Sequence, residues 1–190
     1  MRALAAEWRA LPPQVAWFRS RAGRVARRAG DDFTLLSVTR ADELGRLIDL
    51  ARGRRQVVEL GTGTAWTTIS LALADRTRRV VSYDPVVWDT RERYLALAGS
   101  ARQRISLVQQ PGESGPRPAD APPDLLFIDS SHEREQTLAE FAAWRDALAP
   151  GAVVAFHDYD EPAYPGVTEA VRELGLDGEV FGHLFIWTTG

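Results

Sequence analysis

From Gln56 onward the sequence alternates between short apolar segments and segments with a helical period, and this feature restricts the possible folds most. The apolar segments, which we interpret as strands, are residues 57–60, 79–83, 105–108, 124–128 and 152–156. The segments interpreted as helices are residues 65–74, 89–99, 133–148 and 166–174. Strands that alternate with helices pair in parallel and are covered by helices on both faces. The alternation therefore predicts an α/β fold with a Rossmann-like, doubly wound sheet.

The C-terminal end departs from this alternation. Residues 179–182 and 184–188 are two apolar segments separated by a very short connection, which is typical of an antiparallel pair. We therefore expect seven strands, mostly parallel, with an antiparallel last strand. Residues 111–123 are rich in proline and glycine and are expected to form a loop in place of a helix.

The N-terminal part has a different character. Residues 1–30 are expected to be helical with a break at Pro12 and Pro13, and Thr39 is expected to cap a helix over residues 40–52. The arginines of the first helical region are interpreted as a solvated face. We expect a single domain over residues 1–190, with a helical N-terminal extension at 1–39 and the catalytic fold at 40–190.

Composition excludes several kinds of chemistry. The chain has no cysteine, so it has no disulfide, thiolate nucleophile or cysteine-bound zinc. All 23 basic residues are arginine, which excludes lysine as a Schiff base, a phosphate ligand or a general base. The net charge of −3 argues against nucleic acid as the main partner. The N-terminal charges and the lack of a long apolar run predict neither a signal peptide nor a membrane span, so a cytoplasmic protein is expected.

Polar residues follow the expected strands at the points where they end. In parallel sheets, ligands bind beyond the carboxyl ends of the strands. One such residue would be ordinary turn chemistry, but five at the same edge of a sheet indicate an active site. These residues are Glu59, Asp84, Asp129, His157 and Asp158.

The first two strands carry the signs of a nucleotide site. Gly61 and Gly63 lie between a strand and a helix, where glycine permits a sharp turn and close approach of a ligand. Asp84 ends the next strand, where an acid can bind both hydroxyls of a ribose. A dinucleotide site needs a third glycine where Trp66 stands, and no phosphate-binding loop motif is present. These features favour a nucleotide without phosphates.

With these motifs the sequence resembles class I methyltransferases that use S-adenosylmethionine (SAM), and in particular their small O-methyltransferase-like branch. Residues 57–67 resemble the first family motif, residues 81–84 the second, and residues 180–187 the reversed last strand. The resemblance implies that the methionine part of SAM contacts the first motif, that Asp84 binds the ribose and that residues 113–114 lie at the adenine edge. The residues implied to bind SAM are Glu59, Gly61, Thr62, Gly63, Trp66, Thr67, Asp84, Glu113 and Ser114.

The resemblance also points to the reacting groups. Catechol-type O-methyltransferases carry lysine where His132 stands here, and bind magnesium through residues that match Asp129, His157 and Asp158. We expect His132 to be the general base, since histidine titrates near neutral pH, with Asp129 beside it in the catalytic site. A divalent metal such as magnesium or manganese is expected at Asp129, His157 and Asp158. Alternatively, His132 caps a helix, His157 is a buried histidine bonded to backbone, and the acids belong to turns.

The sequence therefore predicts O-methylation of a small hydroxylated metabolite by SAM. Nitrogen acceptors, the identity of the acceptor and the oligomeric state stay open at this point. The alternatives are an NAD-dependent oxidoreductase, a non-catalytic SAM-binding protein, and a hydroxylase-like relative that shares the fold and a metal. Trp66 and the terminal hairpin disfavour the first. The polar residues at 129, 132, 157 and 158 disfavour the second.

Overall fold

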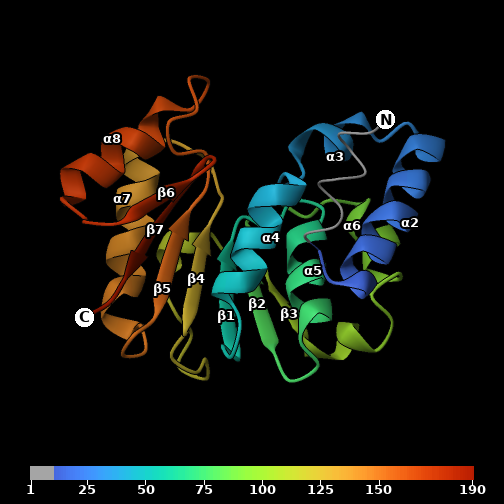
Figure 1. Ribbon diagram of the computed structural model, residues 1–190, viewed down its shortest axis with the longest axis horizontal. Helices are drawn as coiled ribbons and strands as arrows, with labels where there is room; N and C mark the ends of the chain where they lie inside the picture. Colours follow the sequence, from blue (N-terminus) through green and yellow to red (C-terminus); the bar gives the residue numbers. More distant parts are fainter. Residues whose placement is uncertain (1–10) are drawn as a thin grey trace.

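The computed structural model describes residues 11–190 and contains a seven-stranded sheet between two layers of helices (Figure 1). The sheet order is β3-β2-β1-β4-β5-β7-β6. The strands are β1 (Gln56–Leu60), β2 (Arg79–Tyr83), β3 (Ile105–Val108), β4 (Leu125–Ile128), β5 (Val153–Phe156), β6 (Glu179–Phe181) and β7 (Leu184–Thr188).

The first five strands pair in parallel, and β7 runs antiparallel to both β5 and β6. Chain order reverses at β1, whose two neighbours are β2 and β4. Ligands bind at such a switch point in open parallel sheets. The prediction of a doubly wound, mostly parallel sheet with an antiparallel last strand is confirmed.

Helices cover both faces of the sheet. In Figure 1, α4 and α5 lie on one side, with α2 packed outside α5, and α7 and α8 lie on the other. The α-helices are α2 (Pro13–Ala29), α3 (Asp32–Ser37), α4 (Ala41–Leu50), α5 (Trp66–Ala74), α6 (Arg91–Leu95), α7 (Arg134–Trp144) and α8 (Pro165–Leu174). The short 3-10 helices are η2 (Gly99–Arg104), η3 (Gly112–Ser114) and η4 (Arg145–Ala147).

Successive strand residues point to opposite faces, and each face has its own core. Val57 and Phe127 belong to the core under α2, α4 and α5. Val58 and Leu126 belong to the core under α7 and α8. Strands buried on both faces need nearly continuous apolar sequence, which is why these segments stand out in the chain.

Two local expectations are corrected. Thr39 does not cap α4, because the N-cap position belongs to Arg40 and the Thr39 hydroxyl is hydrogen-bonded to the Thr67 hydroxyl at 2.8 Å. The helix expected over residues 89–99 is shorter, since α6 covers only Arg91–Leu95 before η2 begins.

The N-terminal region is helical where it is described. Pro13 begins α2, as the break at Pro12 and Pro13 predicts. The part of the expected helical region at residues 1–10 lies outside the described residues. The helix α3 was not foreseen as a separate element, and its N-cap Asp31 accepts a hydrogen bond from the Thr34 backbone N–H. Within the described chain, every helix is too short or too polar to cross a membrane.

Candidate active site

A cavity of about 550 Å³ opens at the carboxyl ends of β1, β2 and β4. This volume lies in the range of small-molecule sites. Polar residues from the strand ends form much of its lining, and aromatic and aliphatic side chains from other elements complete it. Of the residues implied to bind SAM, Ser114 alone does not line this cavity.

The loop after β1 passes very close to the end of β4. Gly61 has a φ of +95°, and a Cβ atom built on it would lie 1.9 Å from the Asp129 carbonyl oxygen. Only glycine permits this approach. The Asp129 backbone N–H also donates to the Leu60 carbonyl at 2.8 Å. The two strand ends therefore form one continuous wall of the cavity.

Asp84 lies where an acid at the end of β2 is expected, and its carboxylate is already well bonded. It accepts hydrogen bonds from the backbone N–H groups of Gly63 at 2.9 Å and Val86 at 2.8 Å. Arg91 from α6 forms an ion pair with it at 2.8 Å, and both side chains are 9% exposed. Asp84 thus closes the Gly61–Gly63 loop onto β2 and fixes the shape of the cavity at this end.

Glu59 is buried and is bonded to two hydroxyl groups. Ser82 donates to its Oε2 atom at 2.6 Å, and the Thr68 hydroxyl donates to the same atom. Burial raises the pKa of Glu59 to about 8, even though these hydrogen bonds favour the ionised form. Burial therefore favours the protonated form of Glu59 at neutral pH.

Trp66 and Thr67 begin α5 at the base of the cavity. The Trp66 ring is 5% exposed and packs edge-on against Phe18 and Tyr94. Trp66 therefore belongs to the hydrophobic core and also lines the cavity. Thr67 also lines the cavity, while its hydroxyl bonds to Thr39. The Thr62 hydroxyl pairs with that of Ser82 at 2.6 Å.

A second buried carboxylate, Glu140, lies below the turn at η3. The Ser130 hydroxyl donates to Glu140 at 2.7 Å, and Gln136 bridges between Glu140 and Glu113. A Cβ atom at Gly112 would lie 2.5 Å from a Glu140 carboxylate oxygen. Burial raises the pKa of Glu140 to about 7 despite the hydrogen bond from Ser130. Glu140 and Glu113 together form a carboxylate-lined end of the cavity.

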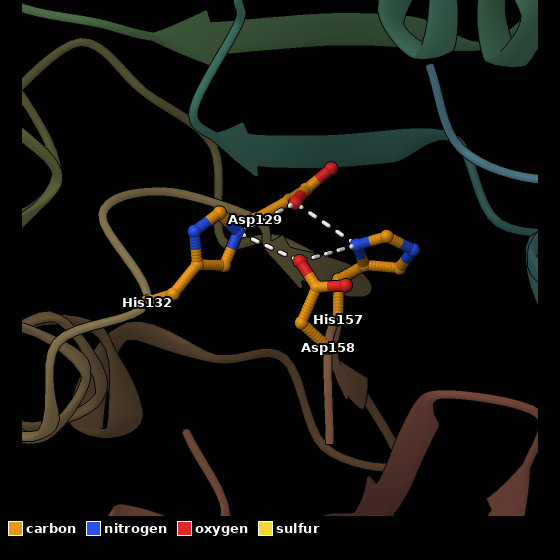
Figure 2. Close-up of side chains that lie close together, drawn as sticks. All are labelled: Asp129, His132, His157 and Asp158. Carbon is orange, nitrogen blue, oxygen red and sulfur yellow. Dashed lines mark hydrogen bonds and ion pairs between the residues drawn. The ribbon is translucent and has the colours of Figure 1, made fainter. Parts of the chain in front are cut away.

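Two carboxylates and two imidazoles meet at the ends of β4 and β5. Figure 2 shows the carboxylates of Asp129 and Asp158 between the rings of His132 and His157. His132 Nε2 lies 2.8 Å from Asp158 Oδ2 and 3.4 Å from Asp129 Oδ1. His157 Nδ1 lies 3.1 Å from each of the same two oxygen atoms. We call these four residues the Asp–His cluster. Asp129 and His132 line the cavity, whereas His157 and Asp158 lie behind them.

Charge attraction within the Asp–His cluster shifts its pKa values. Burial opposes the imidazolium form, but hydrogen bonds to Asp129 and Asp158 outweigh it and raise the pKa of His132 to about 9. The pKa of His157 is likewise raised well above its usual value. The pKa values of Asp129 and Asp158 are lowered, because the two imidazoles overcome the effect of burial. At neutral pH the cluster therefore contains two carboxylates and two imidazolium groups.

Backbone strain accompanies this arrangement. His132 and Asp158 have φ values of +64° and +57°, which residues other than glycine seldom adopt. Such strain persists where surrounding contacts impose it, often at functional sites. The ring of Tyr164 stacks on that of His132 at 4.4 Å between centroids. The orientation of His132 is thus fixed by both the loop and its stacking partner.

A third carboxylate approaches the Asp–His cluster from α4. Glu43 Oε2 lies 3.3 Å from His157 Nε2, so both nitrogens of His157 face acids. Its other oxygen accepts a hydrogen bond from the His183 backbone N–H at 2.9 Å. Glu43 thereby joins α4 to the terminal hairpin behind the cluster. Its side chain is only 1% exposed.

The chemistry of the Asp–His cluster fits a divalent cation. Each of its four residues offers one ligand atom, and these atoms all lie within 4.8 Å of one another. Two carboxylates and two imidazoles form a mixed oxygen and nitrogen donor set, which suits manganese, iron or zinc better than magnesium. The carboxylates of Asp129 and Asp158 are thus close enough to share an ion.

Three contributors to the site were not foreseen from the sequence. Arg91 lies on a short helix well after the motif that it supports, and Glu140 lies within a helix whose acids resemble ordinary surface residues. Glu43 was interpreted only as an acid in the first turn of a helix. Each acts through a contact between segments far apart in the chain, so no local motif marks it.

Comparisons with known proteins support a methyltransferase. The sequence pattern of the family described as "Methyltransferase domain" matches residues 58–159, from β1 to just beyond β5. This segment is more than half of the chain and contains the whole Asp–His cluster. Among curated protein sequences, none matches the chain significantly.

Solved structures with the same fold include proteins with bound cofactor, among them two O-methyltransferases. The O-methyltransferase TomG from Streptomyces achromogenes, in complex with SAM, is 22% identical with a TM-score of 0.66, over 94% of this chain and 91% of that one. An O-methyltransferase from Bacillus cereus, in complex with SAH, is 17% identical with a TM-score of 0.68, over 88% of this chain and 90% of that one. Cofactor-bound Rv0187 from MTB is 23% identical with a TM-score of 0.66, over 100% of this chain and 89% of that one.

The fold, the position of the cavity and the family match agree with one another. The reversed strand β7 and the position of Trp66 separate the chain from NAD-dependent oxidoreductases, as the sequence indicates. The family match covers both the glycine loop and the Asp–His cluster. The chain therefore belongs to the methyltransferase domain family and is a SAM-dependent methyltransferase.

Proposed function

We propose that the protein transfers the methyl group of SAM to a hydroxyl oxygen of a small acceptor. The observation that carries the proposal is the Asp–His cluster, which meets the Gly61–Gly63 loop in a single cavity. Methyl transfer is an in-line displacement at a sulfonium, so both reactants must lie in one cavity with their reacting atoms aligned. A hydroxyl acceptor must also lose a proton, which explains titratable groups at this position.

The SAM end of the cavity is assigned to the residues around β1 and β2. Asp84 receives the ribose hydroxyls, the Gly61–Gly63 loop and Thr67 receive the methionine part, and the end near Glu113 receives the adenine. The lining of this end includes the carboxylates of Asp84 and Glu113, which suit a cofactor with a cationic sulfonium. Glu140 joins Glu113 at the adenine end because the two side chains share Gln136 as a hydrogen-bond partner.

His132 is proposed as the general base that accepts the proton of the acceptor. It lines the cavity, its ring is oriented by Tyr164, and Asp129 and Asp158 would stabilise the imidazolium that forms. The two carboxylates also have an opposing effect. With a pKa of about 9, only about 1 in 100 of His132 side chains is neutral at pH 7. His132 therefore binds a proton strongly, but its neutral form, which is the form that can accept one, is rare as long as the two carboxylates contact imidazoles and no metal.

A divalent metal is proposed as a further part of this site. Asp129, His157 and Asp158 would hold it, with His132 left on the cavity side as the base. When bound there, such a cation supplies positive charge that lowers the pKa of an acceptor hydroxyl and orients its oxygen. The protein residues themselves place the acceptor, accept its proton at His132 Nδ1, the ring nitrogen that does not face Asp129 or Asp158, and keep the reacting atoms close.

The proposal is tested by methyl transfer from labelled SAM to a panel of phenols and alcohols. His132→Ala is expected to lower turnover by about 10²–10⁴, with SAM affinity in titration calorimetry unchanged. His183→Ala is the matched control, because His183 lies in the terminal hairpin and bonds to the Tyr159 carbonyl outside the cavity. Equal turnover in the two variants would exclude His132 as the base.

Metal assistance is tested separately by chelation and by Asp158→Ala. Both treatments are expected to abolish transfer, and added manganese should restore the chelated enzyme. Full activity of the wild type in chelator would remove the metal from the proposal and leave His132 acting alone. Transfer to amines with none to any hydroxyl compound would instead overturn O-methylation.

A further inference from the structure

Glu43 is a buried acid that the proposed mechanism does not use. It lies in the first turn of α4, and its side chain is only 1% exposed. Removing an ionised carboxylate from water is costly unless hydrogen-bond partners compensate for the lost hydration. Each oxygen atom of Glu43 has one such partner, and both partners come from distant parts of the chain. The role of Glu43 is therefore to be found in these two contacts.

The first contact, with His157, determines which ring nitrogen of this histidine carries a proton. Glu43 Oε2 lies 3.3 Å from His157 Nε2. An ionised carboxylate only accepts hydrogen bonds, so the proton of this contact belongs to Nε2. The other nitrogen, Nδ1, lies 3.1 Å from Asp129 Oδ1 and 3.1 Å from Asp158 Oδ2, and Figure 2 shows Nε2 pointing away from both.

This orientation is the one that a metal-bound histidine adopts. An imidazole binds a cation through one ring nitrogen, and its other ring N–H is almost always held by a carboxylate, a carbonyl or water. A cation held by Asp129, His157 and Asp158 binds Nδ1 in place of its proton, which passes to solvent. Without a partner at Nε2, the histidine can instead keep its proton on Nδ1 and donate it to the two carboxylates, which competes with the cation.

The second contact fixes the position of Glu43 itself. The backbone N–H of His183, in the turn between β6 and β7, donates to Glu43 Oε1 at 2.9 Å. Gly182 precedes it with a φ of +57°, and a Cβ atom built there would lie 2.8 Å from the same oxygen. Only glycine therefore fits at this position without moving the carboxylate. The terminal hairpin thus holds Glu43 in place behind His157.

We propose that Glu43 is a positioning residue, which holds the Nε2–H of His157 so that Nδ1 can bind a divalent cation. This inference rests on the proposed function, because it concerns the metal proposed at the Asp–His cluster. Glu43 does not line the cavity and acts only through His157. Both Glu43 and Gly182 lie outside residues 58–159, which match the family pattern, so this support for the metal comes from outside the matched segment.

Zinc binding to the metal-free protein tests this inference without methyl transfer. Titration calorimetry is expected to show zinc affinity about 10–100-fold lower in Glu43→Gln than in the wild type. Glutamine has a single side-chain oxygen, so it cannot accept hydrogen bonds from His157 and His183 through separate atoms. Asp49→Asn is the control, because it removes the same charge from an exposed position on α4. Unchanged affinity in Glu43→Gln overturns the proposal, and so does an equal loss in Asp49→Asn.

A second pair of variants separates the position of Glu43 from its charge. Gly182→Ala keeps the charge but places a methyl group against the Glu43 carboxylate, and zinc affinity is expected to fall about tenfold. Gly175→Ala is the control, since Gly175 has a similar φ of +61° with open space around it. Equal affinities in these two variants overturn the positioning role. Melting temperature is measured for every variant, so that a loss of folding is not mistaken for a loss of binding.

Nuclear magnetic resonance of the histidine rings reads the position of the proton directly. The chain has only three histidines, so ¹⁵N-histidine labelling gives a spectrum simple enough to assign. In the zinc-bound wild type, His157 should carry zinc on Nδ1 and a proton on Nε2, whose resonance is shifted downfield by the bond to Glu43. Zinc on Nε2, or an Nε2–H resonance unchanged in Glu43→Gln, overturns the proposal.

The outcomes separate this inference from the proposed function. If zinc binds as expected but chelation leaves methyl transfer intact, metal assistance fails and the role of Glu43 stands. If chelation abolishes transfer but Glu43→Gln binds zinc like the wild type, metal assistance stands and this inference fails. Absence of zinc binding to the wild type also overturns the inference, while O-methylation is judged by the transfer assay alone.

Discussion

Glu59 lies near the end of β1 and Asp129 directly follows the neighbouring strand β4, yet their pKa values shift in opposite directions. Glu59 has hydroxyl partners only, and burial raises its pKa to about 8. Asp129 faces two imidazoles, and its pKa is lowered. The first belongs to the end of the cavity assigned to SAM and the second to the end assigned to the acceptor. Two acids near the same edge of a sheet can thus be set to different protonation states by their partners.

The same contrast extends to how the two ends are built. At the SAM end, short loops directly after β1 and β2 supply Gly61, Gly63 and Asp84. At the acceptor end, the Asp–His cluster depends on Glu43 from α4 and on the terminal hairpin, and Phe33 from α3 also lines the cavity. A cofactor site of local loops is easily shared by a family, whereas an acceptor site assembled from distant segments is free to vary.

The largest expected effect comes from the point where the two ends touch. Gly61→Ala would force a Cβ atom against the Asp129 carbonyl and also requires a positive φ. We expect a loss of about 4 kcal/mol or more in the free energy of unfolding. Gly53→Ala is the control, because Gly53 also has a positive φ but has open space around it, and should cost about 1 kcal/mol. Equal losses in urea unfolding would show that the contact at Gly61 does not constrain the two ends.

A smaller effect concerns the buried acids of the SAM end. The pKa of Glu140 is about 7 in the folded protein against an ordinary 4.5. The unfolded chain releases this proton first as pH rises, so stability falls between about pH 4.5 and 7, by roughly 3 kcal/mol. In Glu140→Gln, the free energy of unfolding measured in urea should no longer show this fall between pH 5 and pH 8. Glu135→Gln on the same helix should keep it, since that side chain is 82% exposed.

The next largest expected effect is on SAM affinity and concerns Asp84, the acid assigned to the ribose of SAM. Asp84→Ala removes a charged hydrogen-bond partner, which costs about 1.5–3 kcal/mol. SAM affinity should fall by about ten- to a hundredfold in titration calorimetry. Asp89→Ala, at an exposed position in the same loop, should leave it unchanged. Affinity unchanged in both variants would remove Asp84 from the SAM site.

Sequence reasoning predicted the fold, and all but one of the residues that it assigned to SAM line one cavity. The reason is physical. Strands buried on both faces, such as β1 and β4, require apolar runs that can be recognised in the chain. Glycines and acids placed directly after those strands indicate a binding site even when the tertiary structure is not known. Thr39 was assigned to the wrong partner because its hydroxyl bonds to Thr67 rather than to the next helix. Contacts of this kind exist only after folding, and propensity carries no information about them.

The resemblance to catechol-type enzymes supplied the members of the Asp–His cluster, but not their electrostatics. With the same two carboxylates in contact with both imidazoles, neither histidine keeps its ordinary pKa. A histidine pictured as a base near neutral pH is, in this arrangement, an imidazolium. That difference follows from distances of about 3 Å between side chains, which spacing along the chain does not determine.

The smallest expected effect tests whether the acceptor end of the cavity can be destabilised without a change at the SAM end. Asp31 holds α3 in place, because it accepts hydrogen bonds from the Thr34 backbone N–H at 3.1 Å, from the Thr34 hydroxyl at 2.9 Å and from the Tyr94 hydroxyl at 2.6 Å. Asp31→Ala removes this cap and should cost about 1 kcal/mol of stability. Burial opposes the charge of Asp31, but the hydrogen bonds from Tyr94 and Thr34 lower its pKa. The contribution of Asp31 is therefore present above its ordinary pKa and disappears as pH falls through the lowered folded value.

Because α3 carries Phe33, which lines the cavity, Asp31→Ala should weaken binding of a phenolic acceptor such as 4-methylcatechol a few-fold, by about the same 1 kcal/mol, while SAM affinity stays at the wild-type value. Asp32→Ala is the control, since Asp32 lies beside Asp31 and leaves the cap bond to Thr34 intact. Calorimetric titrations of both ligands on both variants make the comparison. If SAM affinity falls together with catechol affinity in Asp31→Ala, the two ends of the cavity are coupled through α3, and the division between a local cofactor site and an assembled acceptor site does not hold.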